Sequence, residues 1–250
     1  MMKDLIRSLM PRAIRPRRIV AGPLRGTWLV TSWHDYPAGL TGRTERPLLD
    51  WFAKHVRPGE TWLDVGAHYG YTAFALAKLV GPTGRVFTFE PVAATAGCVD
   101  RGRALNGLGH VTVLPFGLGA ADTLEIRRLA STRGMADSTL AQDAGAWLVT
   151  VPIARFDWLW PLVNGADAAI HGVKIDVQGM ELETLAGMRD TLKKWRPRLV
   201  VELHTGVSRE RVLALLGELG YSSDAVPIEP ANGELAPLFL DNQSYAFDPV

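Results

Sequence analysis

Short apolar runs alternate with amphipathic segments along most of the chain. Apolar runs of four to eight residues bounded by glycine or charge are typical of buried strands, whereas apolar positions three and four residues apart are typical of helices. In the first half of the chain the pattern predicts a hairpin from 18–20 and 27–32, a helix at 48–56, a strand and a helix within 61–80, a strand at 84–89, a helix at 92–105 and a strand at 111–114. In the second half it predicts strands at 124–129 and 147–153, a strand from 172, a helix at 182–192 and a strand at 198–204. A helix after Ser208 and strands at 225–228 and 244–247 complete the pattern. Repeated strand–helix units predict a mostly parallel sheet with helices on both faces.

The stretch 61–71, Thr-Trp-Leu-Asp-Val-Gly-Ala-His-Tyr-Gly-Tyr, joins a short strand through a glycine turn to the start of a helix. Such a turn presents free backbone N–H groups and the positive end of a helix dipole, which suit a charged cofactor. A dinucleotide is disfavoured because His68 and Tyr71 stand where its fingerprint needs the second and third glycine. An aspartate at the strand end with two glycines four apart instead resembles motif I of S-adenosylmethionine-dependent methyltransferases.

An acidic residue also closes the next predicted strand. Glu90, followed by Pro91, comes twenty residues after Gly70, and a carboxylate at that strand end is suited to accept hydrogen bonds from two ribose hydroxyls. Phe116 and Gly117, just past the third strand, are placed to line an adenine. Loop, spacing and acid together predict that the chain binds S-adenosylmethionine.

Polar pairs mark the ends of two later strands. Lys174 and Asp176 fall on one face of a buried strand, and Glu202 and His204 fall on one face of the strand after it. In parallel sheets ligands gather beyond the carboxyl ends of the strands, where these residues would join the acids of the first two strands. The sequence therefore predicts one shared active site.

Four motifs in this order resemble the FkbM-type methyltransferase family. They are Leu63-Asp64-Val65-Gly66-Ala67, Phe89-Glu90-Pro91, Val173-Lys174-Ile175-Asp176-Val177 with Gly179 and Glu181, and Arg196-Pro197 leading to Glu202. The resemblance implies an α/β, Rossmann-like seven-stranded methyltransferase fold of strand order 3-2-1-4-5-7-6, with strand 7 antiparallel and helices on both faces. It also implies O-methylation of a hydroxyl on a small molecule, a sugar or glycan, or a secondary metabolite.

The resemblance carries a set of cofactor contacts onto this chain. They are Asp64, Gly66, Ala67, His68, Gly70, Glu90, Pro91, Phe116 and Gly117. Two positions depart from the family, which usually has Asn where this chain has His68 and Glu where it has Gln178. The first departure alters a contact expected at the amino-acid end of the cofactor. The second removes a carboxylate beside Asp176, so the role of that Glu cannot be carried over.

An aliphatic hydroxyl is a poor nucleophile until its proton is withdrawn, by a base or by a metal that acidifies it. Asp176, Glu202 and His204 are the candidate catalytic residues, with His204 the natural base. Asp176 and Glu202 are also candidate oxygen ligands for a hard ion such as magnesium. The alternative is structural, with Asp176 paired to Lys174, Glu202 capping a loop and His204 on the polar surface.

Two further functions stay open at this stage. A catalytically silent binding module would keep the cofactor motif and lose the second centre, where Gln178 is the departure. A nucleic-acid methyltransferase is disfavoured because the chain has no basic stripe beyond its first residues and no Asn-Pro-Pro-aromatic motif. The expected acceptor is therefore a small molecule or a glycan.

Length and charge set the outer limits. The 250 residues suit one large α/β domain at 44–250 behind a basic extension and β-hairpin at 1–43, and the net charge is only +1. The polar segment 131–143 is expected to be irregular, either a lid or substrate loop or a segment without function. A single cysteine and the lack of a transmembrane or signal-peptide pattern predict a cytoplasmic protein.

Overall fold

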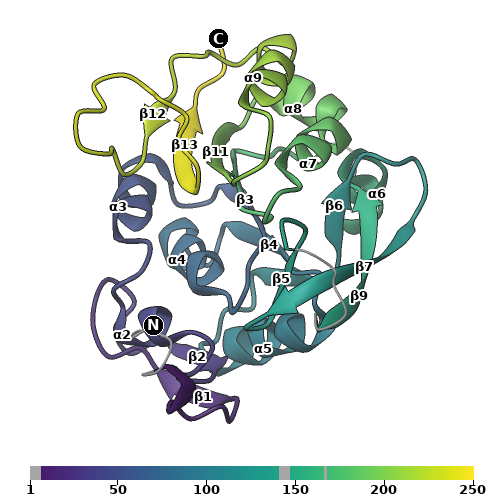
Figure 1. Ribbon diagram of the computed structural model, residues 1–250. Helices are drawn as coiled ribbons and strands as arrows, with labels where there is room; N and C mark the ends of the chain where they lie inside the picture. The colour runs from purple at the N-terminus through teal and green to yellow at the C-terminus, as the bar shows by residue number, and fades with distance from the viewer. Residues whose placement is uncertain (1–6, 141–146, 166–167) are drawn as a thin grey trace.

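The computed structural model describes residues 7–140, 147–165 and 168–250. A seven-stranded sheet lies at the centre of the molecule (Figure 1). In spatial order its strands are β12 (Val226–Pro227), β13 (Gln243–Phe247), β11 (Arg198–Leu203), β10 (Gly172–Ile175), β3 (Thr61–Val65), β4 (Arg85–Phe89) and β5 (Val111–Leu114). Neighbours from β11 to β5 pair in parallel, whereas β13 runs antiparallel to β11 and to β12. The predicted order 3-2-1-4-5-7-6 with an antiparallel strand 7 is confirmed.

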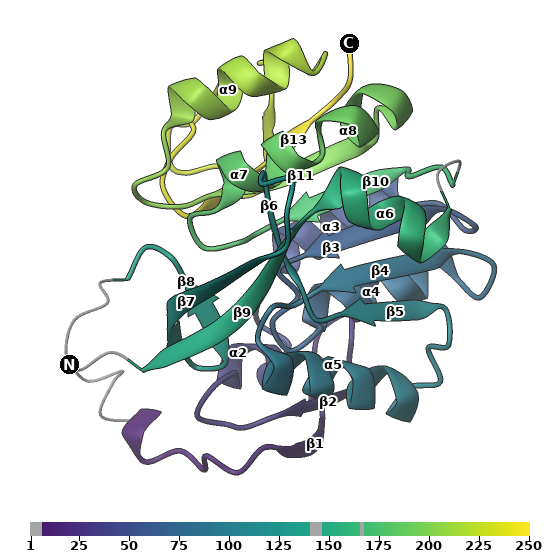
Figure 2. The ribbon, with the colours of Figure 1, turned by 90° about the vertical axis from the view of Figure 1, so that its right-hand side faces the viewer.

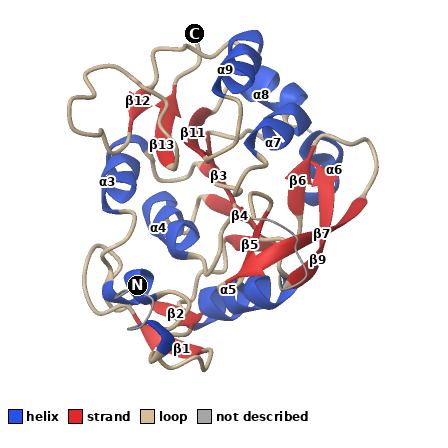
Figure 3. Ribbon diagram, in the orientation of Figure 1, coloured by secondary structure: helices blue, strands red, loops and turns tan. Residues whose placement is uncertain are grey.

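Helices cover both faces of this sheet (Figure 3). One face carries α3 (Arg46–His55), α4 (Tyr71–Val80) and α5 (Ala93–Leu105), and the other carries α6 (Phe156–Asn164), α7 (Glu181–Gly187), α8 (Arg189–Trp195) and α9 (Arg209–Glu218). Every residue of α4 except Lys78 and Leu79 is buried, as its nearly charge-free sequence predicts. The helix that follows the first glycine turn is therefore fixed firmly against the sheet.

The predicted N-terminal hairpin is present, formed by β1 (Arg15–Arg18) and β2 (Trp28–Thr31), and its first strand begins three residues earlier than the pattern indicates. Leu24 and Leu29 are buried in the same apolar cluster as α3 and α4. Each buried leucine contributes about 1.5–3 kcal/mol, so the hairpin is part of the core on that face. The short α2 (Pro37–Thr41) leads from the hairpin to α3. The division of the chain at residue 43 stays a prediction.

A second, four-stranded sheet was not predicted. Its order is β6 (Gly117–Gly119), β9 (Leu148–Arg155), β7 (Glu125–Thr132) and β8 (Met135–Asp137), and Figure 2 shows it running obliquely beside the central sheet. The expectation of an irregular segment at 131–143 is wrong for its described part, because β7 and β8 form a hairpin there. The turn consists of Arg133 and Gly134, both with positive φ, which suits the twist of a two-residue hairpin. Residues 141–143 lie outside the described residues.

Two helices differ from the predicted pattern. The apolar segment of α6 contains Pro161 and was not predicted to be helical. The single helix expected over 182–192 is two short helices, which meet at Met188. A Cβ on Gly187 would lie 2.0 Å from the carbonyl oxygen of Gly119, so the end of α7 packs directly on the backbone of β6. No helix among the described residues has the length and apolar character needed to cross a membrane.

Candidate active site

The loop after β3 depends on Gly66. Its φ is +86°, in the region that favours glycine, and a Cβ there would lie 1.7 Å from the carbonyl oxygen of Asp176. The backbone N–H groups of Gly66 and Ala67 both donate to the carbonyl of Phe89. The glycine turn is thus held between the ends of β4 and β10, and a side chain at position 66 would push these strand ends apart.

A buried lysine joins this loop to the second centre. Lys174 Nζ donates to the carbonyl of Gly66 at 3.1 Å, and lies 3.1 Å from Asp176 Oδ2 and 3.5 Å from Asp64 Oδ1. Burial alone would lower the pKa of Lys174, but the charges of Asp176 and Asp64 outweigh it and hold that pKa above its usual range. Lys174 therefore stays a cation, and it fixes the carboxylate of Asp176 relative to the glycine turn.

A pocket of about 610 Å³ opens where the central sheet meets the second sheet. Val65 and Phe89, at the carboxyl ends of β3 and β4, line it together with Leu129, Met135 and Ile153 from the second sheet. Six of the nine predicted cofactor contacts are among the lining residues: Gly66, His68, Glu90, Pro91, Phe116 and Gly117. The sequence reasoning did not anticipate the wall that the second sheet provides.

The other three predicted contacts are not among the lining residues. Asp64 is fully buried, and its Oδ2 accepts a hydrogen bond from the hydroxyl of Thr72. Ala67 is buried in the turn itself, and Gly70, with a φ of +85°, precedes the first residue of α4. All three lie outside the lining of this pocket, and their contact with a cofactor stays a prediction.

Glu90 faces the pocket as a buried acid. Its Oε2 accepts the backbone N–H of His68 at 2.8 Å, and its Oε1 accepts that of Val92 at 2.9 Å. Burial raises the pKa of Glu90 to about 8, although both N–H groups favour the ionised form. At neutral pH the protonated form of this carboxyl is therefore favoured.

The ring of His68 is fixed by aromatic neighbours. Its centroid lies 4.8 Å from that of Tyr36 and 4.3 Å from that of Tyr69. Burial lowers the pKa of His68 to about 4, so the ring is neutral and its Nε2–H donates to the carbonyl of Arg133 at 2.9 Å. The φ of His68 is +48°. The hydrogen bond to Arg133 directs the ring toward the β7–β8 hairpin.

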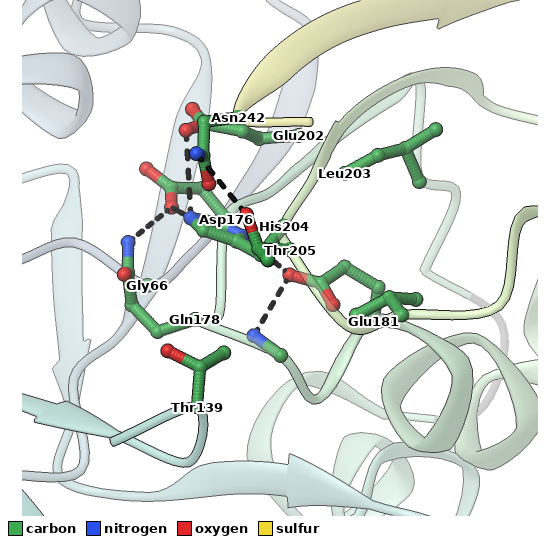
Figure 4. A network of polar contacts seen from close by, with 12 residues as sticks. Gly66, Thr139, Asp176, Gln178, Glu181, Glu202, Leu203, His204, Thr205 and Asn242 are labelled. Atoms are coloured by element: carbon green, nitrogen blue, oxygen red, sulfur yellow. Dashed lines mark hydrogen bonds and ion pairs between the residues drawn. The ribbon is translucent and has the colours of Figure 1, made fainter. Parts of the chain in front are cut away.

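The second centre brings Asp176, Glu202 and His204 together on the adjacent strands β10 and β11 (Figure 4). His204 Nε2 lies 3.6 Å from Asp176 Oδ1 and 3.4 Å from Glu202 Oε1. Its Nδ1 lies 2.6 Å from Oε1 of Glu181, which is fully buried. The side chain of His204 is 6% exposed, so it is not polar surface, and Asp176 lines the first pocket as well as pairing with Lys174.

The pKa values of Asp176, Glu202 and His204 are shifted by burial and by one another's charges. Burial raises the pKa of Asp176, but the charges of Lys174 and His204 outweigh burial and lower it overall. The charge of Asp176, followed by burial, raises the pKa of Glu202 to about 8. Burial lowers the pKa of His204, but the bond to Glu181 and the charge of Asp176 raise it overall. The charge of Asp176 thus favours a proton on both Glu202 and His204.

Sequence reasoning missed several residues of this centre. Glu181 appeared only as part of a family motif, yet it orients the ring of His204. Glu45 precedes α3 with a φ of +54°, and its pKa is raised by burial and by the charge of Asp176. Its distance of more than one hundred residues from Asp176 in the sequence left no local signal. The strand-end pattern and the family motifs that identified the other acids do not apply to a residue in a connecting loop.

A second pocket, of about 810 Å³, lies on the far side of Glu202. Its lining comes from the connection between α2 and α3, from the segment after β12 and from the start of β13: Arg43, Thr44, Glu45, Pro47, Leu48, Glu202, Ile228, Glu229, Asn242, Gln243 and Ser244. Asp176 lines the first pocket, Glu202 lines the second, and His204 contacts both carboxylates. The three side chains therefore stand between the two pockets.

Residues 64–223 match the family described as the methyltransferase FkbM domain, which is more than half of the chain. The chain belongs to the FkbM methyltransferase family. It is by family and fold an S-adenosylmethionine-dependent methyltransferase, as the four motifs predict. The comparison with curated proteins gives no match.

Solved structures share the fold at low sequence identity. The methyltransferase FkbM from Methylobacillus flagellatus KT is 17% identical, with a TM-score of 0.50 over 84% of this chain and 52% of that chain. An rRNA methylase from Streptococcus thermophilus is 12% identical, with a TM-score of 0.50 over 84% and 98%. A protein from Streptococcus mutans described as a methyltransferase, in complex with SAH, is 12% identical, with a TM-score of 0.51 over 82% and 98%. The chain spans about half the length of the FkbM structure, and these likenesses show the fold alone.

Proposed function

We propose that the chain catalyses S-adenosylmethionine-dependent O-methylation of a hydroxyl on a small molecule, a sugar or glycan, or a secondary metabolite. The observation that carries the proposal is the position of Asp176, which lines the cofactor pocket and contacts His204. A binding module without catalysis does not require a histidine such as His204, whose Nδ1 pairs with the buried Glu181 and whose Nε2 faces Asp176 and Glu202. The intact geometry therefore favours an enzyme over a binding module.

The first pocket fits S-adenosylmethionine chemically. Glu90 offers a carboxylate for the ribose hydroxyls, and Phe116, Leu129 and Ile153 offer apolar surface for a flat ring. Gly66 lets the backbone come close to the amino-acid end of the ligand. When bound, S-adenosylmethionine supplies an activated methyl group, so the protein has to supply alignment and proton removal.

His204 is the proposed base. Its Nε2 faces the space between Asp176 and Glu202, where an acceptor hydroxyl can approach from the second pocket. Glu181 holds Nδ1 and stabilises the imidazolium that forms when Nε2 takes the proton. Asp176 stabilises the same positive charge from the side of the cofactor pocket. These roles of Asp176, Glu202 and His204 are proposals drawn from their geometry.

A divalent cation is the alternative means of acidifying the hydroxyl. Ligand atoms of Asp176, Glu202 and His204 lie within 4.8 Å of one another. The two carboxylates suit magnesium, whereas an imidazole in the set suits manganese or zinc better. Treating the protein with a chelator and then adding magnesium or manganese decides between the two versions. Activity that survives the chelator supports His204 as the base, and activity restored by a metal supports the cation.

The charge distribution disfavours nucleic acid as the acceptor. The net charge is +1, and the second pocket carries three carboxylates, Glu45, Glu202 and Glu229, against Arg43. A phosphate backbone needs clusters of lysine and arginine, which this pocket does not offer. A small acceptor fits a pocket of this kind better.

The test uses Asp176→Asn and His204→Gln with a panel of sugars and polyols, and follows the release of S-adenosylhomocysteine. Both variants should bind S-adenosylhomocysteine within about threefold of the wild type while turnover falls by about 10²-fold or more, because a lost general base costs 10²–10⁴-fold. Glu218→Gln, on α9, removes an exposed ion pair with Arg189 of α8 and serves as the matched control. Full activity in both active-site variants would remove the second centre from the mechanism.

A further inference from the structure

The second pocket is lined by acidic side chains that form no ion pair with a lysine or arginine of the described residues. Glu45 and Glu229 line it, and no ion pair joins either of them to a cation within 7–140, 147–165 and 168–250. Glu202 is the third acidic residue of the lining, and its Oε1 lies 3.4 Å from Nε2 of His204. Arg43 is the single lysine or arginine among the described lining residues. Acidic residues therefore outnumber basic ones in the lining next to the proposed base.

The remaining lining groups are suited to hydroxyls. Thr44 and Ser244 offer hydroxyls, and Asn242 and Gln243 offer amide groups that can both donate and accept. Ser244 Oγ already lies 3.5 Å from Glu202 Oε2, so this side of the pocket reaches the catalytic carboxylate. Apolar contacts are limited to the side chains of Pro47, Leu48 and Ile228. Such a lining selects a hydrophilic ligand and not an aromatic or lipidic one.

Glu45 is partly buried and Glu229 is exposed, and both line this pocket. A ligand that brings a positive charge to these two side chains gains a partner for them, whereas an anionic ligand does not.

We propose that the second pocket binds the methyl acceptor, and that the acceptor is a polyhydroxylated amine, such as an amino sugar or an aminocyclitol, whose ammonium group is held by Glu45 and Glu229. This proposal rests on the proposed function, because it takes His204 and Asp176 as the place of methyl transfer. The ammonium group lies toward the α2–α3 connection, and a hydroxyl on the same ring faces His204. Phosphorylated and uronate acceptors are excluded by the carboxylates.

The experiment compares three sugars that share one ring and differ in charge at one position: 6-amino-6-deoxyglucose, glucose and glucose 6-phosphate. Each is titrated into the protein saturated with S-adenosylhomocysteine, and binding is measured by saturation-transfer NMR at constant ionic strength. The amine should bind at least about tenfold more tightly than glucose, and the phosphate should not bind measurably. The preference for the amine should weaken as salt is added, because exposed charges are screened.

Charge-neutral variants test the residues. Glu229→Gln and Glu45→Gln should each reduce the preference for the amine several-fold without changing the affinity for S-adenosylhomocysteine, whereas the control Glu218→Gln should change neither. Equal binding of amine and glucose, a preference for the phosphate, or binding of none of the three sugars while S-adenosylhomocysteine still binds would overturn the proposal. Failure to bind S-adenosylhomocysteine at all would instead overturn the proposed function.

Discussion

Replacing Glu90 with Gln should separate the charge of this residue from its shape. In the ligand-free protein burial raises the pKa of Glu90 to about 8, although the carboxyl accepts two backbone N–H groups. An ionised carboxylate can accept hydrogen bonds from both ribose hydroxyls of the cofactor, whereas a protonated acid presents a donor on one oxygen. Binding of S-adenosylhomocysteine should therefore release a proton from Glu90 at neutral pH.

The size of the effect follows from the pKa. With a pKa of about 8, roughly one protein in a hundred carries the ionised form at pH 6, one in eleven at pH 7 and nearly all at pH 9. A neutral group at this position costs about tenfold in affinity, so the affinity should rise by about tenfold in total between pH 6 and pH 9, mostly above pH 7. The Gln variant loses the charge-assisted bonds, which differ from neutral ones by about 1–1.5 kcal/mol, so it should bind about tenfold more weakly at pH 9. At pH 7 the two proteins should bind almost equally.

Isothermal titration calorimetry in buffers of different ionisation enthalpy measures both the affinity and the number of protons released. S-adenosylhomocysteine has titrating groups of its own, and the Gln variant serves to subtract their contribution. We expect the wild type to release more protons than the variant when it binds the ligand at pH 7. Parallel pH profiles for wild type and variant, or equal proton release, would show that Glu90 does not bind the ligand as a newly ionised carboxylate.

The other predictions concern stability and the glycine turn. In the folded protein the pKa of Glu90 lies above its usual value. The stability that its carboxyl contributes is therefore complete below about pH 4.5 and is lost as the pH rises through about 8. Urea unfolding of the protein without ligand should show this loss relative to Glu90→Gln. Lys174→Met leaves Asp64 and Asp176 without their cation and should cost about 3–5 kcal/mol in chemical denaturation, whereas the exposed Lys193→Met should change little. Gly66→Ala should lose at least about 2 kcal/mol and the binding of S-adenosylhomocysteine, because its φ is +86° and the new Cβ would meet the backbone of Asp176. Gly97→Ala, where a Cβ would meet nothing within 4 Å in α5, should instead stabilise the folded protein by about 0.5–1 kcal/mol. A destabilised Gly97→Ala protein would contradict the explanation that Gly66→Ala acts through its backbone conformation and its contact with Asp176.

The central sheet could be predicted because its signals are local. The apolar strand at 61–65 and the nearly charge-free helix after it are read from consecutive residues, and each strand-end acid directly follows or ends its own apolar strand. The second sheet has weaker signals. Its β7–β8 turn is Arg133-Gly134, which lacks the Asn or Asp typical of such hairpins, and the polar residues around it concealed the pairing. Pro161 similarly concealed α6, since proline inside a helix is costly in isolation and is tolerated here by packing.

The candidate site was predictable only where strands determine it. Asp176, Glu202 and His204 follow from the alternation of two strands and the parallel pairing of β10 with β11. Glu45 reaches the same place through the packing of the N-terminal segment on α4, which no pattern in the local sequence records. For Asp64 the motif predicts the position at the end of the strand correctly. It does not predict whether the carboxylate faces the pocket or Lys174, which it contacts in the structure.

The two pockets draw on separate parts of the chain. Lining residues of the first pocket fall between Val65 and Met180, and apart from Glu202 those of the second fall at 43–48 and 228–244. Substitutions in residues 43–48, or in the segment before the last strand, can therefore change the second pocket without changing the residues that line the first. A protein built in this way can change its partner molecule by substitution or insertion at its margins. Related enzymes should accordingly diverge fastest in these two segments while the central 116 residues from Val65 to Met180 change slowly.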